Sequence, residues 1–168
     1  MRRIKFKGYG VVLPKNTVSF KDHIRYRISE GETQLQLAIA ACEKALKNSN
    51  ISINDIDCIV SASAVGVQPI PCMAALIHEK IAKGTSIPAL DINTTCTSFI
   101  TALDTMSYLL EAGRYKRVLI VSCDVASSAL NPNQKESFQL FSDGAVAFVV
   151  EKSDEEIGII DSTLKTWS

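Results

Sequence analysis

The sequence predicts an α/β protein in which helices pack against a mostly parallel sheet. Short apolar segments with strand character alternate along the chain with longer segments whose apolar residues recur at the helical period. The segment VLIVSCDV, within residues 117–125, is apolar almost throughout, which is typical of a strand covered on both faces. Parallel strands need crossover connections, so this alternation favours a mostly parallel sheet with helices against it.

The composition is that of an ordinary globular domain. The 168 residues are 46% hydrophobic and 21% charged, and 18 basic residues balance 18 acidic ones. This balance gives no reason to expect nucleic acid or an anionic membrane as a partner. No apolar run approaches the length of a membrane span, and the basic start lacks the apolar stretch of a signal peptide. We therefore expect one domain, residues 1–168, that binds neither nucleic acid nor a membrane.

The first part of the chain predicts a strand, a polar segment and a helix. Residues 4–13 alternate loosely and end at Pro14, which predicts a strand, whereas residues 15–32 are polar and irregular. The segment SEGE, residues 29–32, fits a capping box and predicts a helix over about 33–47. The apolar residues of that helix follow the helical period: Leu35, Ala38, Ile39, Cys42, Ala45 and Leu46.

The later elements continue the alternation. Further strands are predicted at residues 57–64, 87–93, 117–125, 145–151 and 157–165. One helix begins at Pro71 and ends at Gly84, and another covers residues 97–112 and ends at Gly113. The last two strands are expected to be adjacent, because only the acidic turn SDEE separates them.

The helix predicted over residues 97–112 is apolar around its whole circumference. Its apolar residues are Phe99, Ile100, Ala102, Leu103, Met106, Tyr108, Leu109 and Leu110. A helix of this kind is buried on all sides, whereas a single sheet covers one side only. We therefore expect a second layer, supplied by another chain or by a continuation of this one, and self-association where the helix stays uncovered.

Cys96 lies at the junction between the strand 87–93 and this apolar helix. A thiol at such a junction meets the unpaired N–H groups and the positive end of the helix. This environment favours the nucleophilic thiolate, so Cys96 is a candidate catalytic residue. The alternative is an inert, buried cysteine, because free cysteines in proteins are more often buried and unreactive.

Of the other four cysteines, three indicate core packing, and Cys72 is a weaker candidate for chemistry than Cys96. Cys42, Cys58 and Cys123 fall within apolar helix or strand patterns, and Cys72 is near a helix start but lacks a preceding strand. The odd total and the absence of a C-x-x-C pair argue against a disulfide framework or a zinc site. Reduced thiols fit a cytoplasmic protein.

No convincing general base accompanies Cys96. His23 is expected in a solvated loop and His78 on a partly exposed helix surface, so neither is a favoured catalytic base. Asp124 ends a predicted strand and Asp143 precedes a glycine; both are interpreted as structural carboxylates that hold turns or loops. No dinucleotide, Walker A or G-x-S-x-G sequence is present.

The segment DINTTCTSF, residues 91–99, resembles the nucleophile motif D-x-x-x-x-C-x-G-F of the 3-oxoacyl-(acyl-carrier-protein) synthase III family. Other segments follow in the family's order: GYGVVLP, IDCIVSAS, PCMAALIHEKI, VLIVSCDV and FSDGAVAFVVE. The resemblance implies one half of a thiolase-like fold, with a mixed, mostly parallel five-stranded sheet and helices on both faces. Residues 1–168 would be the N-terminal half, and the C-terminal half is absent from this chain.

The resemblance also implies a function. Cys96 matches the acyl-accepting nucleophile, with its own backbone N–H as one oxyanion-hole donor, and Phe99 matches a packing residue. The implied reaction is acyl transfer to Cys96 followed by decarboxylative condensation with a malonyl thioester. No permanently bound cofactor is implied; the substrate is an acyl-coenzyme A or acyl-carrier-protein thioester. The implied partners are acyl carrier protein and the missing half or a partner subunit, which supplies the catalytic His and Asn in a homo- or hetero-oligomer.

Two departures from the family pattern leave alternatives open. Ser98 stands where the motif has glycine, and residues 15–32 are too short for the family's early segment, which carries a Trp and an Arg that help to bind coenzyme A. One alternative is a non-catalytic, truncated homologue that acts as a structural partner in a synthase-like assembly. Another is a small cysteine hydrolase, in which His23 or His78 would have to lie close to Cys96.

Overall fold

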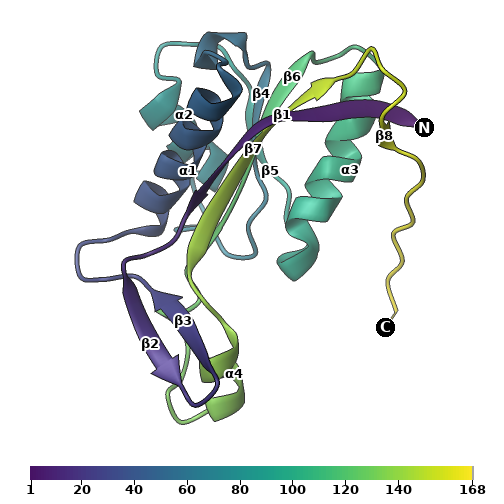
Figure 1. Cartoon of the computed structure of the whole chain (residues 1–168). Helices are drawn as coiled ribbons and strands as arrows, with labels where there is room; N and C mark the ends of the chain where they lie inside the picture. Colours follow the sequence, from purple (N-terminus) through teal and green to yellow (C-terminus); the bar gives the residue numbers. More distant parts are fainter. Residues whose placement is uncertain (168) are drawn as a thin grey trace.

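The computed structural model describes residues 1–167 and places a six-stranded sheet between helices on both faces (Figure 1). The strands, in the order in which they lie in the sheet, are β5 (Ala89–Asp91), β4 (Cys58–Ser61), β6 (Arg117–Asp124), β7 (Gly144–Lys152), β1 (Arg2–Val12) and β8 (Gly158–Ile159). β4 pairs in parallel with β5 and β6, and the pairs from β6 to β8 are antiparallel, so four of the six strands (β5, β4, β6 and β1) run in one direction. The predicted mixed α/β architecture is confirmed, with six strands instead of five.

The pairing of the last strand differs from the prediction. β8 has two residues and pairs with Arg2 and Arg3 of β1, whereas β7 pairs with β1 on its other side. The two strands that were expected to be adjacent are therefore separated by β1. The pairing is close, because a Cβ atom on Gly158 would lie 2.1 Å from the Arg2 carbonyl oxygen.

Two hydrophobic cores lie on opposite faces of the sheet. Helices α1 (Gln34–Ser49) and α2 (Met73–Ile81) cover one face, and α3 (Ser98–Glu111) covers the other (Figure 1). β6 contributes to both cores: Leu119 and Val121 face α1, while Val118 and Ile120 face α3. The continuous apolar run in its sequence is explained by this position between two layers.

The start of α1 is correctly placed, but its cap is one turn later than predicted. Thr33 is the N-cap: its hydroxyl accepts the Gln36 N–H, and the Gln36 side chain accepts the Thr33 N–H, which completes a capping box. Ser29 and Glu32 form a separate turn, in which the Ser29 N–H donates to the Glu32 carboxylate at 2.7 Å. α1 extends to Ser49, two residues beyond the predicted end.

Residues 15–32 are not irregular. They contain a hairpin of β2 (Asn16–Phe20) and β3 (His23–Arg27), which extends away from the main sheet beside α4 (Lys135–Leu140) (Figure 1). Three side chains of β3 bind consecutive carbonyl groups of α4: Arg27 Nη2 binds Phe138 O at 2.6 Å, His23 Nε2 lies 3.2 Å from Gln139 O, and Arg25 Nε binds Leu140 O at 2.9 Å. Cationic groups at the carboxyl end of a helix satisfy carbonyls that have no partner within it.

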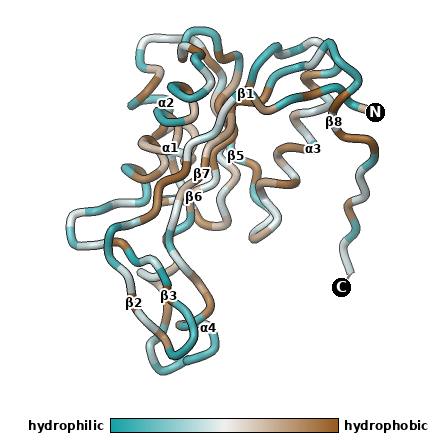
Figure 2. The backbone as a smooth tube through the Cα atoms, in the orientation of Figure 1, coloured by the Kyte–Doolittle hydropathy of each residue, from teal (hydrophilic) through white to brown (hydrophobic). Residues whose placement is uncertain are grey.

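α3 is covered on one side only in this chain. Its sheet-facing residues Ala102, Met106 and Leu110 are fully buried, whereas Ile100 is 60% and Tyr108 54% exposed. Figure 2 shows that α3 and the central strands carry much of the hydrophobic sequence. No second layer covers the outer side of α3 among residues 1–167, so the expected covering layer remains a prediction. None of the helices in this part of the chain combines the length and the apolar character needed to cross a membrane.

Candidate active site

The chain turns sharply between β5 and α3, and Cys96 lies in this turn. A short 3₁₀ helix, η2 (Thr95–Thr97), connects the strand to α3 and holds the thiol, which is exposed. Thr95 has φ 54°, a left-handed conformation that is uncommon for a residue with a side chain and carries a conformational cost. We call residues 93–98 the elbow. The predicted strand–cysteine–helix junction is thus present, with Cys96 two residues before the first residue of α3.

Side chains of the elbow hold its backbone in place. Ser98, which is 2% exposed, accepts the Thr94 N–H through Oγ at 3.0 Å and donates to Thr95 O at 2.6 Å. The Thr95 N–H donates to Asn93 Oδ1 at 2.8 Å. The residue that replaces the motif glycine therefore stabilises the turn around the cysteine, a role that its sequence position did not reveal.

The backbone N–H of Cys96 differs from the N–H groups of its neighbours. Among residues 94–98, the N–H groups of Thr94, Thr95, Thr97 and Ser98 all donate hydrogen bonds. The Cys96 N–H has no acceptor among residues 1–167. A free N–H beside a nucleophile is the type of donor that stabilises an oxyanion.

A mostly apolar cavity of about 500 Å³ lies beside the thiol. It is lined by Ala64, Val65, Cys96, Asp124, Val125, Ala126, Ala129, Leu130, Phe141 and Ser142. These residues come from the segment after β4, from the end of β6 and the segment that follows it, from the elbow and from the segment before β7. The arrangement can receive an apolar group attached to a reacting centre at Cys96.

Asp124 is the ionisable group that shares this cavity with Cys96. One of its carboxylate oxygens, Oδ1, accepts the N–H groups of Ala64 at 2.9 Å and Val65 at 3.0 Å. Desolvation by burial raises the pKa of Asp124 above its usual value, against the opposite effect of these two hydrogen bonds. Asp124 therefore holds a loop, as predicted, although the loop is the one after β4 and not the one that follows Asp124.

Asp124→Asn is expected to make stability less dependent on pH. Because the pKa of Asp124 is raised in the folded state, the native chain binds more protons than the unfolded chain, and stability falls as pH rises through that pKa. In the variant, the amide oxygen accepts both N–H bonds in place of the carboxylate oxygen. The side chain no longer carries a charge. The midpoint of thermal unfolding of the variant relative to the parent should therefore increase between pH 4 and pH 7. A difference that decreases over this range would contradict the assignment.

Asp143 is a structural carboxylate, as predicted. It is 1% exposed and accepts the N–H groups of Ile28 at 2.8 Å and Ser127 at 2.9 Å. These contacts join the residue after β3, the segment after β6 and the residue before β7. Asp143 thus fixes loops around the cavity without lining it, whereas its neighbour Ser142 is part of the cavity wall.

The remaining cysteines are not placed for chemistry at Cys96. Cys42, Cys58 and Cys123 are buried, and desolvation raises the pKa of each thiol, to about 12 for Cys42. Cys72 is half-buried at the N-cap of α2, where its side chain makes no capping hydrogen bond. The three core assignments are confirmed.

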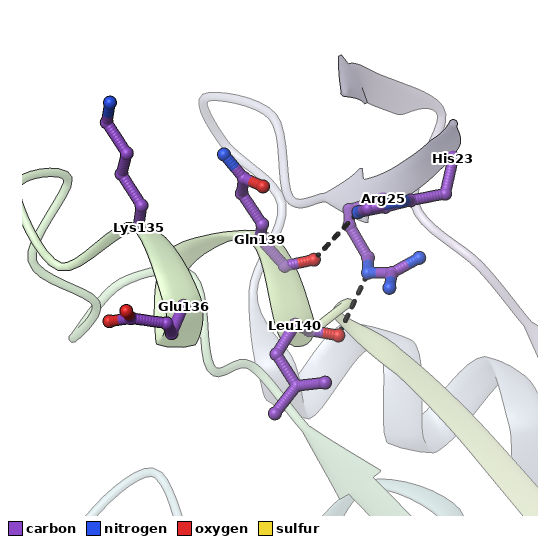
Figure 3. A pocket seen from close by; sticks show the side chains of 6 residues that line it. All are labelled: His23, Arg25, Lys135, Glu136, Gln139 and Leu140. Atoms are coloured by element: carbon purple, nitrogen blue, oxygen red, sulfur yellow. Dashed lines mark hydrogen bonds between the residues drawn. The ribbon is translucent and has the colours of Figure 1, made fainter. Parts of the chain in front are cut away.

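Neither histidine lines the cavity beside Cys96. His78 is half-buried in α2, and its Nε2 lies 3.2 Å from the Thr85 hydroxyl; His23 is exposed, but in a strand and not in a loop. A separate depression of about 350 Å³, shown in Figure 3, is lined by His23, Arg25, Lys135, Glu136, Gln139 and Leu140. The cysteine-hydrolase alternative therefore lacks its base. No group of three or more potential metal ligands is present within residues 1–167.

Comparison with known proteins supports the resemblance in the nucleophile motif. Residues 90–168 match the model of the family described as 3-oxoacyl-[acyl-carrier-protein (ACP)] synthase III. The β-ketoacyl-[acyl-carrier-protein] synthase III of Neisseria gonorrhoeae is 31% identical over 98% of this chain, and that of Clostridium perfringens is 34% identical over 95%. The chain belongs to the 3-oxoacyl-(acyl-carrier-protein) synthase III family.

The structure agrees with this relationship. The crystal structure of 3-oxoacyl-[acyl-carrier-protein] synthase III from Aquifex aeolicus superposes with a TM-score of 0.85 at 29% identity, over 91% of this chain and 55% of that protein. The two curated synthases are covered over 57% and 54% of their lengths. The chain thus has the thiolase-like synthase III fold and spans about half the length of the family members that it matches.

Proposed function

We propose that Cys96 is the acyl-accepting nucleophile of a condensing acyltransferase that a second thiolase-like half completes. The observation that carries the proposal is the exposed Cys96 thiol next to a free backbone N–H, at the edge of an apolar cavity. Covalent catalysis by such a thiol divides a difficult condensation into two easier steps. The proposal assigns the whole activity to the completed protein, since this chain covers about half of its relatives.

The first proposed step is acyl transfer. The thiolate attacks the carbonyl carbon of an acyl thioester, a bond forms between that carbon and Cys96 Sγ, and the carbon–sulfur bond to the carrier breaks. The leaving thiolate takes up a proton. The Cys96 N–H would stabilise the oxyanion of the intermediate, and the cavity of about 500 Å³ would receive the acyl chain.

The second proposed step is condensation. A malonyl thioester loses carbon dioxide, and the resulting carbanion attacks the acyl carbon on Cys96 and releases the thiolate. The family resemblance assigns the His and Asn of this step to the second half. The part of the cavity lining that this chain contributes contains no histidine, which is consistent with a histidine supplied by the second half. The isolated chain is therefore expected to accept an acyl group at most, without condensing it.

An exposed apolar surface on the α3 side offers a place for the second half. The aromatic rings of Phe6, Tyr9 and Phe99 each lie within 5.9 Å of the Phe148 ring, measured between centroids, and Phe6 and Tyr9 are more than half exposed. Together with the outer residues of α3, they form the kind of patch that marks an interface. Covering it would complete the layer that the apolar character of α3 requires.

Reconstitution tests the proposed function. The chain is co-expressed with the C-terminal half of a synthase III relative, and the mixture receives acyl-coenzyme A and malonyl-acyl-carrier-protein. We expect a 3-oxoacyl-acyl-carrier-protein product that neither half forms alone. A stable complex of the two halves without any product would favour the alternative, in which the chain is a structural partner in a synthase-like assembly.

A further inference from the structure

The peptide group between Ala64 and Val65 is held from both sides by side chains. Its carbonyl oxygen accepts a hydrogen bond from Asn93 Nδ2 at 2.8 Å, and its N–H donates to Asp124 Oδ1 at 3.0 Å. The Ala64 N–H donates to the same carboxylate oxygen at 2.9 Å. Hydrogen bonds arranged in such a chain polarise and strengthen one another. We call Asn93, the 64–65 peptide and Asp124 the clamp.

The clamp is connected directly to the elbow. The other end of the Asn93 amide, Oδ1, accepts the Thr95 N–H at 2.8 Å. Thr95 immediately precedes Cys96 and has the left-handed φ of 54°. One side chain therefore fixes both the strained residue before the thiol and the peptide of a neighbouring segment.

The segment that the clamp holds is part of the cavity wall. Ala64, Val65, Asp124 and Cys96 line the same cavity. The next carbonyl, that of Val65, accepts a bond from Gln34 Nε2 at 2.6 Å, which anchors the wall to α1 as well. Because hydrogen bonds hold this wall at successive peptides, its distance from the Cys96 thiol is fixed.

We propose that Asn93 is a positioning residue that, with Asp124, sets the cavity wall relative to the Cys96 thiol and so controls how an apolar tail on the reacting group is received. The identification of this tail with an acyl chain rests on the proposed function. The clamp itself follows from the hydrogen bonds alone. It acts through the 64–65 peptide and touches no reacting atom.

Maleimides with tails of two lengths test the clamp on the full chain. The Cys96 thiol adds across the maleimide double bond, so that sulfur bonds to one ring carbon, a proton goes to the other, and no group leaves. Rates for N-hexylmaleimide and N-ethylmaleimide are measured at Cys96 by peptide mapping, with Cys72 as an internal reference. The parent chain should prefer the hexyl reagent about tenfold, because its additional methylene groups enter the apolar cavity.

Five variants, one of them a control, distinguish positioning from a general loss of stability. Asn93→Ala should reduce the hexyl preference to within about twofold, and Asp124→Ala should do the same, since both release one peptide. The double variant should show no further loss, whereas Asp124→Asn, which retains an acceptor oxygen, should keep the preference. Asn48→Ala is the matched control: it removes an amide bond of 2.8 Å to Tyr9 O, which is outside the cavity lining, and should keep the preference.

Several results would overturn the proposal. They are a parent chain without a hexyl preference, an Asn93→Ala chain that retains it, or losses that add in the double variant. The outcome is independent of acyl transfer. If the preference depends on the clamp but Cys96 accepts no acyl group in the reconstituted protein, the clamp stands and the proposed function fails.

Discussion

Cys96→Ala is expected to lower product formation in the reconstituted assay by more than about a thousandfold, because the variant has no nucleophile to carry the acyl group. The folded structure should be unaffected, since the thiol is exposed and its side chain contributes no packing to either core. The rate is measured as 3-oxoacyl product formed per unit of complex.

Cys72→Ala is the matched control for this experiment. Cys72 is the other cysteine outside the buried set, and it lies at a helix start as well. Its replacement should leave the rate within about twofold of the parent, because Cys72 does not line the cavity beside Cys96. Activity that survives Cys96→Ala, or is lost in Cys72→Ala, would mean that the nucleophile is misassigned.

Gly10→Ala is expected to destabilise the fold by about 3 kcal/mol, the upper part of the usual range for overpacking. A Cβ atom on Gly10 would lie 2.3 Å from Ala41 O and 2.7 Å from Ala45 N, both in the backbone of α1. Because backbone atoms cannot rotate away, α1 would have to move off β1, and the core beneath it would open. Urea unfolding followed by circular dichroism measures the change in free energy.

Gly66→Ala is the control for the glycine variant. The nearest atom to a Cβ at this position is Gln68 O at 3.5 Å, an ordinary contact. The expected change is within about 0.5 kcal/mol. A Gly10→Ala chain as stable as Gly66→Ala would show that α1 and β1 are not packed as closely as described.

The hydrophobic period of the sequence was sufficient to predict the sheet and its main helices. β6 is apolar on both faces because it lies between α1 and α3, and α1 is apolar at helical spacing because it covers one face. The position of Cys96 followed from the same pattern, since a strand and a helix had to meet near residue 96. Local sequence was enough wherever burial on one face decided the structure.

The sequence pattern failed where tertiary contacts decide the structure. The β2–β3 hairpin turns at Lys21-Asp22, which lacks the Asn-Gly or Asp-Gly signature, and α4 has six residues. The hairpin contacts α4 through Arg25 and Arg27. These two residues are more than 100 residues away in sequence from the α4 carbonyls that they bind. The alternation in HIRYR was the available signal, because it places three basic side chains on one face of a strand.

The sequence pattern also did not predict the contacts of the clamp and of the elbow. Asn93 and Ala64 are separated by 29 residues, and Asp124 and Ala64 by 60. No local pattern records such contacts. Ser98 gave a partial signal, since a serine in place of a motif glycine adds a hydroxyl that must find partners once it is buried.

The mass of the acylated chain shows whether Cys96 accepts the acyl group. The chain is incubated with acyl-coenzyme A in complex with the C-terminal half of a synthase III relative, and the intact mass and the modified peptide are determined. We expect one acyl group per chain, located on Cys96. An unmodified chain, or an acyl group located on Cys72, would contradict it.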